Sequence, residues 1–177
     1  MSYKRKSYSD LDKIASRFLR TNNQLKPPID IDLIIERSGL DIIPLPGLKK
    51  EGQLSGALAG DFSCIYYDER EDEKFPTRIR FTLAHELAHF ILHKNLIEDE
   101  LLSTNLLWKA GLRKLYDDSS SFEKEADDLA GLLLVPSQLF KEFYGSGKTH
   151  NEIAKIFNVT TIVIEIRSRK EFSSTRY

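Results

Sequence analysis

"FTLAHELAHFILH", residues 81–93, carries three of the four histidines in this chain of 177 residues. On a helix, successive side chains are turned by ~100°. Apolar side chains such as Leu83 and Leu87 then fall on one side of the stretch, and His85 and His89 fall together on the opposite side. A histidine pair that is separated from the apolar stripe is typical of a binding site rather than of core packing.

The segment matches the pattern H-E-x-x-H. Side chains four residues apart on a helix lie ~6 Å from each other, so His85 and His89 can both bind one Zn²⁺ ion. Glu86 between them can then act as a general base toward water at the metal. The stretch therefore predicts a metal site with a catalytic glutamate.

His93 is not expected to be the third ligand. It lies eight residues beyond His85, a rise of ~12 Å along a helix, which one ion cannot bridge. The longer pattern H-E-x-x-H-x-x-G-x-x-H is absent, since Leu92 and Asn95 occupy the glycine and last histidine positions. We expect His93 at a solvated helix end, or in a hydrogen bond near the site.

The third ligand must come from another part of the chain. Cys64 is the only cysteine, which excludes a cysteine-based zinc site and leaves His150 or an acidic residue. In "SSSFEKEADDLAGLLLVP", residues 119–136, Glu125 lies at the edge of the apolar stripe, where a carboxylate is costly unless it is paired or bound to metal. We therefore predict that Glu125 is the third ligand.

Other polar residues of this second helix are given different roles. Asp128 lies one turn beyond Glu125 and can orient a ligand imidazole through its ring N–H. Glu123 and Asp127 are expected to project further outward. The alternative is that Glu125 and Asp128 are solvated charges at the rim of the helix.

The remaining pattern predicts an α+β fold with a small antiparallel or mixed sheet. Ser9, Asp30 and Thr149 are expected N-caps, and Ser120 with Glu123 matches a capping box. Strands are expected at 40–46 and, as a pair around a turn at Gly60-Asp61, within 56–69. The stretch 161–169 is expected as a last helix, with a strand as the alternative.

Bulk composition favours an ordinary cytoplasmic protein. The net charge is −1, with 41% hydrophobic and 30% charged residues, which does not indicate nucleic-acid coating. No apolar run approaches the ~18 residues that span a bilayer, and the basic start MSYKRKSYSD is not followed by the apolar run of a secretory signal.

Two stretches together, "RFTLAHELAHFILH" and "FEKEADDLAGLLLVP", resemble the ImmA/IrrE-type metallopeptidases, a family of compact zincins. The resemblance extends over most of residues 27–169. It implies that His85 and His89 bind zinc, that Glu86 is catalytic and that Glu125 corresponds to the glutamate that begins the second motif. Asp127, Gly131 and Val135 depart from the usual asparagine, alanine and methionine.

The resemblance also implies an organisation and a function. We expect an N-terminal helix over 1–26, a zincin-like metallopeptidase core over 27–145, and a helix–turn–helix-like segment over 146–177 packed on the core. The expected activity is zinc-dependent cleavage of a helix–turn–helix repressor, which would derepress genes of a mobile element or a stress response. Mn²⁺ or Fe²⁺ is an alternative to zinc. The segment 94–121 matches nothing in the family and is a candidate specificity region.

Several points stay open. The oxyanion of the reaction needs a donor, for which the candidates are His150, Tyr144, Tyr116 and Tyr66. A non-cleaving, partner-binding zincin fold is one alternative function. A DNA-binding module is another, carried by Arg167, Arg169 and Lys170, but Glu152, Glu165 and Glu171 cancel their charge, so direct binding to nucleic acid is not expected.

Overall fold

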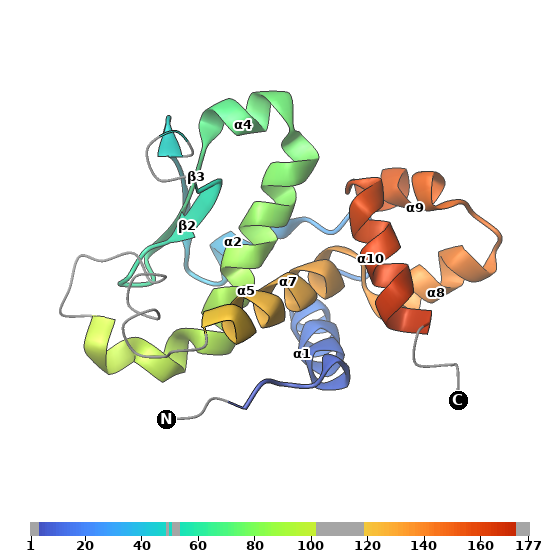
Figure 1. Cartoon of the computed structure of the whole chain (residues 1–177), viewed down its shortest axis with the longest axis horizontal. Helices are drawn as coiled ribbons and strands as arrows, with labels where there is room; N and C mark the ends of the chain where they lie inside the picture. Colours follow the sequence, from blue (N-terminus) through green and yellow to red (C-terminus); the bar gives the residue numbers. More distant parts are fainter. Residues whose placement is uncertain (1–3, 49, 51–53, 102–118, 173–177) are drawn as a thin grey trace.

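The computed structural model describes residues 4–48, 50, 54–101 and 119–172 of the chain. Within these ranges the fold is α+β, as predicted (Figure 1). The elements follow one another as α1 (Tyr8–Thr21), α2 (Ile31–Arg37), β1 (Asp41–Pro44), β2 (Gly56–Leu58), β3 (Cys64–Tyr67), α4 (Glu69–Lys74), α5 (Pro76–Leu101), α7 (Ser119–Leu134), α8 (Ser137–Gly145), α9 (His150–Phe157) and α10 (Thr161–Phe172).

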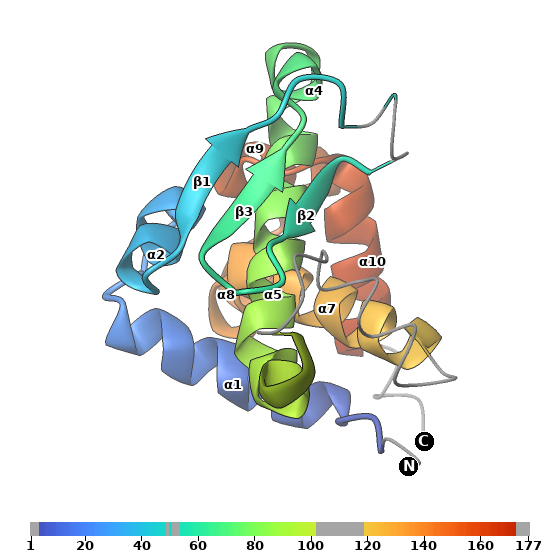
Figure 2. The same cartoon turned by 90° about the vertical axis from the view of Figure 1, so that its left-hand side faces the viewer.

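The sheet is small and mixed, with the strand order β1-β3-β2. β1 runs parallel to β3, with Asp41 opposite Cys64, and β2 runs antiparallel to β3, with Gly56 opposite Tyr67. Both expected strand regions are therefore confirmed, including the turn at Gly60 that joins β2 to β3. β2 is an edge strand, and Figure 2 shows the sheet lying across α5.

The long helix α5 begins at Pro76 and packs between the sheet and α7. Its apolar side buries Ala84 and Leu87 completely. α7 contributes the predicted buried stripe, with Phe122 and Leu129 both fully buried, and α1 packs against α7. The apolar faces of α5 and α7 thus pack against each other, and this contact positions the side of α5 that carries the histidines.

The helix boundaries are partly corrected. Ser7, rather than Ser9, caps α1, because its side chain accepts a hydrogen bond from the backbone N–H of Asp10. The predicted caps Asp30 and Thr149 are confirmed, and Thr149 forms the full capping box with Glu152. The side chain of Ser120, the other expected cap, and residues 102–118 of the unassigned segment lie outside the described part of the chain.

The C-terminal helices are fixed by a buried arginine. α10 is a helix and not a strand, and Arg167 on it is 2% exposed. Its guanidinium donates hydrogen bonds to the carbonyl oxygen of Val135 at 3.1 Å, to Oγ of Ser137 at 2.9 Å and to the carboxylate of Glu171 at 3.2 Å. One of the three basic residues considered for DNA contact is therefore used inside the protein. None of the described helices is both long and apolar enough to cross a membrane.

Candidate metal site

α5 brings His85 and His89 to one side of the helix, one turn apart. Their Nε2 atoms lie 3.0 Å from each other and their ring centroids 4.6 Å. His89 is fully buried, while the His85 side chain is 12% exposed. The pair therefore presents two nitrogen atoms to a common point at the edge of the α5–α7 junction, as the sequence predicts for an H-E-x-x-H helix.

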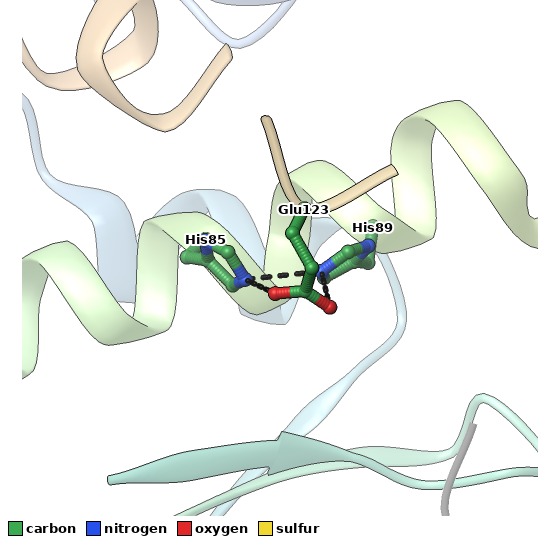
Figure 3. A group of neighbouring side chains, drawn as sticks. All are labelled: His85, His89 and Glu123. Atoms are coloured by element: carbon green, nitrogen blue, oxygen red, sulfur yellow. Dashed lines mark hydrogen bonds and ion pairs between the residues drawn. The ribbon is translucent and has the colours of Figure 1, made fainter. Parts of the chain in front are cut away.

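The carboxylate that approaches this pair is that of Glu123, on α7. Its oxygens lie 3.3 Å from Nε2 of His85 and 3.6 Å from Nε2 of His89 (Figure 3). One ligand atom from each of the three residues lies within 4.8 Å of the others, which is close enough to share one ion. The Glu123 side chain is 40% exposed, so the group is reached from solvent on this side.

Glu125 lies elsewhere, and this corrects the predicted ligand set. Its side chain is fully buried, and its Oε2 lies 3.0 Å from Nε2 of His93. Its Oε1 accepts a hydrogen bond from the backbone N–H of Lys6. Glu123 and Glu125 are two residues apart, which turns their side chains by about 200° on a helix. They therefore cannot both face the His85–His89 pair.

Glu125 was predicted as a ligand because of its position at the apolar edge of the helix, but a buried carboxylate can also be satisfied by a partner other than a metal. That partner is His93, which is fully buried and forms a hydrogen bond near the site, as one of its two expected placements, rather than lying at a solvated helix end. A signal for Glu123 was present in the sequence. Glu123 and Asp127 are one turn apart on α7, just as His85 and His89 are on α5, and such paired spacings allow two helix faces to meet.

Asp127, and not the predicted Asp128, contacts a ring of the histidine pair. The Nδ1 atom of His85 lies 2.9 Å from Oδ1 of Asp127, so Asp127 is the acid that orients a ring of the pair. Asp128, which was predicted to do so, forms an ion pair at 2.8 Å with Arg5 and another with Lys170. As a carboxylate, Asp127 accepts the Nδ1 proton of His85, so Nε2 is the ring nitrogen that faces His89 and Glu123.

Glu86 is buried beside the pair, with 1% of its surface exposed. Its Oε2 accepts a hydrogen bond at 3.1 Å from the backbone N–H of Leu58 in the edge strand β2. The side chain predicted to act as the base is therefore held by the strand that borders the site. This hydrogen bond links the sheet to the centre of α5 and fixes the position of the carboxylate.

Burial favours the neutral form of His89. Burial lowers the pKa of His89 to about 3, although the nearby negative charge of Glu123 acts in the opposite direction. A metal ion binds the neutral form of imidazole, so a ring that is neutral at physiological pH does not have to lose a proton first. Two imidazoles and one carboxylate are a donor set that zinc accepts in catalytic sites. The residues present therefore fit a zinc ion.

The residue that would stabilise an oxyanion stays unassigned. Tyr144 and His150 pack against each other, with ring centroids 6.1 Å apart, and Tyr144 also packs on Phe172 at 4.6 Å. These contacts place both candidates in the cluster formed by the C-terminal helices. Tyr66 lies in β3, and Tyr116 lies outside the described residues.

The family model for the IrrE N-terminal-like domain, named as peptidase family M78, matches residues 35–169 of the chain. This range covers all three strands of the sheet, both helices of the site, α8, α9 and most of α10. The chain therefore belongs to the IrrE N-terminal-like family, and the predicted resemblance is confirmed. Among curated protein sequences, none matches the chain.

A solved structure of a Mycobacterium tuberculosis transcriptional regulator has a similar fold, with a TM-score of 0.61 and 16% sequence identity. The similarity covers 91% of this chain and 46% of that one. The chain thus spans about half the length of that regulator. At this identity the likeness shows a shared fold.

Proposed function

We propose that the chain is a zinc-dependent endopeptidase that cuts a helix–turn–helix transcriptional repressor at a specific site. The observation that carries this proposal is the convergence of His85, His89 and Glu123 beside the buried carboxylate of Glu86. Membership of a peptidase family supports the reaction class. The repressor as substrate, and a role in derepressing genes of a mobile element or a stress response, rest on the resemblance to ImmA/IrrE-type proteins.

His85, His89 and Glu123 would hold the zinc ion. When bound, zinc supplies Lewis acidity, which polarises a peptide carbonyl and makes water more acidic. Glu86 takes one proton from the attacking water as its oxygen bonds to the carbonyl carbon. Glu86 then gives this proton to the amide nitrogen as the C–N bond breaks, so that one acid and one amine leave the site.

The surrounding residues position these groups. The Leu58 N–H holds one oxygen of Glu86 and limits its rotation. β2 is an edge strand whose residues are buried, and we expect an extended substrate segment to add beside it as a further strand. The substrate would then lie next to both Glu86 and the histidine pair.

The test replaces Glu86 by Gln. Zinc-loaded wild type and Glu86→Gln are incubated with helix–turn–helix repressors of the same genome, and new N-termini are identified by mass spectrometry. We expect one new N-terminus with the wild type and a loss of at least about 100-fold in its rate of appearance with the variant. Bound zinc, measured by elemental analysis, should be equal in the two proteins.

The other outcomes are decisive as well. Equal cleavage by Glu86→Gln would remove Glu86 as the base. A repressor that is bound by the wild type but never cut would favour the alternative of a non-cleaving, partner-binding zincin fold. Retention of a DNA fragment at physiological salt without a repressor present would favour the DNA-binding alternative.

A further inference from the structure

A chain of buried polar contacts runs away from the metal site behind His89. The Nδ1 atom of His89 lies 3.1 Å from Nδ1 of His93, one turn further along α5. The opposite ring nitrogen of His93, Nε2, lies 3.0 Å from Oε2 of Glu125. All three side chains are fully buried. The order of contacts is thus His89, His93, Glu125, with each ring joined through both of its nitrogens.

The Glu125 end of this series of contacts defines the direction of the hydrogen bonds. Oε1 of Glu125 accepts from the backbone N–H of Lys6, a donor that cannot reverse. An ionised carboxylate only accepts, so Oε2 accepts the Nε2 proton of His93. A neutral imidazole carries one N–H, so Nδ1 of His93 is an acceptor.

The next step reaches the metal ligand. Because Nδ1 of His93 accepts, His89 must donate from Nδ1, and the Nε2 lone pair of His89 is left bare. That nitrogen is the one that lies 3.0 Å from Nε2 of His85 and 3.6 Å from Glu123. The other imidazole tautomer of His89 would place a proton on Nε2 and block metal binding.

We infer that His93 and Glu125 are positioning residues that hold His89 in the Nδ1–H tautomer and thereby leave its Nε2 available to zinc. This inference rests on the proposed zinc site. It gives Glu125 a role one step removed from the metal in place of the predicted role as ligand. The backbone N–H of Lys6 completes this series of contacts, because it donates a hydrogen bond to the second carboxylate oxygen of Glu125.

A packing role would not require these residue types. His93 makes an edge contact with Phe122, with ring centroids 4.9 Å apart, which a phenylalanine at position 93 can reproduce. Phenylalanine cannot accept the proton from His89, whereas an asparagine can offer its side-chain oxygen near the position of Nδ1. His93→Phe and His93→Asn therefore separate ring packing from hydrogen-bond acceptance.

The first measurement is zinc affinity, by competition with a chromogenic chelator. We expect His93→Phe to weaken zinc binding by about 10–100-fold, the usual effect of losing the partner of a ligand histidine. His93→Asn should recover a substantial part of that loss. Glu125→Gln should also weaken zinc binding, because glutamine has one acceptor oxygen and one NH₂ donor group. The NH₂ group would then face another donor, either the N–H of Lys6 or the N–H of His93. Thermal unfolding of each variant establishes that it is folded.

The matched control is Asp128→Asn. Asp128 is a buried acid on the same helix, but its partners are Arg5 and Lys170 rather than a histidine. It should bind zinc as the wild type does. If His93→Phe and Glu125→Gln also bind zinc with unchanged affinity, the inference is wrong.

The second measurement reads the tautomers directly, by ¹⁵N-edited NMR of the histidine rings with and without zinc. We expect His89 protonated at Nδ1 and His93 at Nε2 in both states of the wild type. His93 protonated at Nδ1 would overturn the inference. A wild type that binds no zinc would contradict the proposed function, and the tautomers of the metal-free protein would still decide whether the chain of hydrogen bonds exists.

Discussion

The carboxylate of Glu123 on α7 lies 3.3 Å from Nε2 of His85 on α5, and this contact joins the two helices at the candidate metal site. The same carboxylate lies 3.6 Å from His89. It is the third member of the group that can share one ion. The arrangement makes the ligand set testable at a single residue.

Replacing Glu123 by Gln should weaken zinc binding by at least the roughly 10–100-fold that follows loss of an outer partner of a ligand. The reason is that an amide is a much poorer zinc ligand than a carboxylate. Zinc affinity is measured by chelator competition, and Glu165→Gln, an exposed acid on α10, is the control. Wild-type affinity in Glu123→Gln would exclude it from the ligand set.

Asp127→Asn should weaken zinc binding by roughly 10-fold, the low end of the range for outer partners. Asp127 contacts Nδ1 of His85 at 2.9 Å, but its side chain is 56% exposed, so water can replace part of its effect. The NMR spectrum of the His85 ring should show a more mixed population of tautomers. If the affinity does not change while the spectrum does, the contact orients the ring without contributing to binding.

Gly56→Ala should destabilise the fold by about 1–3 kcal/mol, as overpacking in a close contact usually does. A Cβ at this position would meet Cγ2 of Thr82 well inside van der Waals distance and would lie 3.1 Å from the carbonyl oxygen of Tyr66. Urea unfolding measures the loss. Adding Thr82→Ser, which removes the methyl group, should restore part of it.

Gly145→Ala is the control for this substitution. A Cβ at Gly145 meets no atom within 4 Å, so stability should stay close to that of the wild type. If the free energy of unfolding changes equally in Gly56→Ala and Gly145→Ala, β2 does not approach α5 as closely as described.

The contribution of Glu171 to stability should depend on pH. Burial by itself raises the pKa of Glu171, but the hydrogen bond from Lys141 and the charge of Arg167 outweigh it, so the pKa falls below the ordinary 4.5. The carboxylate therefore stabilises the folded state above about pH 4.5, and this stabilisation disappears as the pH falls through the lower folded-state pKa.

The variant Glu171→Gln measures this contribution. At pH 7 it should be less stable than the wild type by about 1–3 kcal/mol, since Arg167 stays buried with a weaker acceptor. The difference should shrink as urea unfolding is repeated at decreasing pH down to 3. Glu142→Gln, an exposed acid on α8, should show no such convergence. A difference that is constant with pH would mean that the charge of Glu171 is not involved.

The sequence predicted that His85 and His89 lie together on one helix, but it did not predict which acid approaches them, for a physical reason. The positions of His85, His89 and Glu86 follow from local helix periodicity, which a single segment determines. Which acid faces the His85–His89 pair depends on how α7 is rotated about its axis relative to α5. The periodicity of α7 alone does not predict that rotation. A buried carboxylate, Glu125, was a reasonable ligand until His93 was found beside it.

The other differences have the same origin. Ser9 was predicted as the N-cap of α1 and Ser7 is the N-cap, because either serine can cap a helix. The structure shows that the side-chain oxygen of Ser7 accepts the backbone N–H. The short helices α4 and α8 were not predicted, because each is too short for a clear periodic pattern. The alternative of a strand at 161–169 is wrong, because this stretch forms α10. Tertiary packing, in which Arg167 is buried, decides for the helix.

Glu123 and Glu125 face opposite ways on one helix, and each meets a histidine of α5 at a different depth. Deleting or inserting one residue of α7 just after Glu125 would rotate both acids by about 100° relative to the rest of the helix. Both acids would then miss their histidines together. Natural length variation in this family should therefore be excluded from the part of α7 that follows Glu125, and should be tolerated in the connection 146–149, which is solvent-exposed.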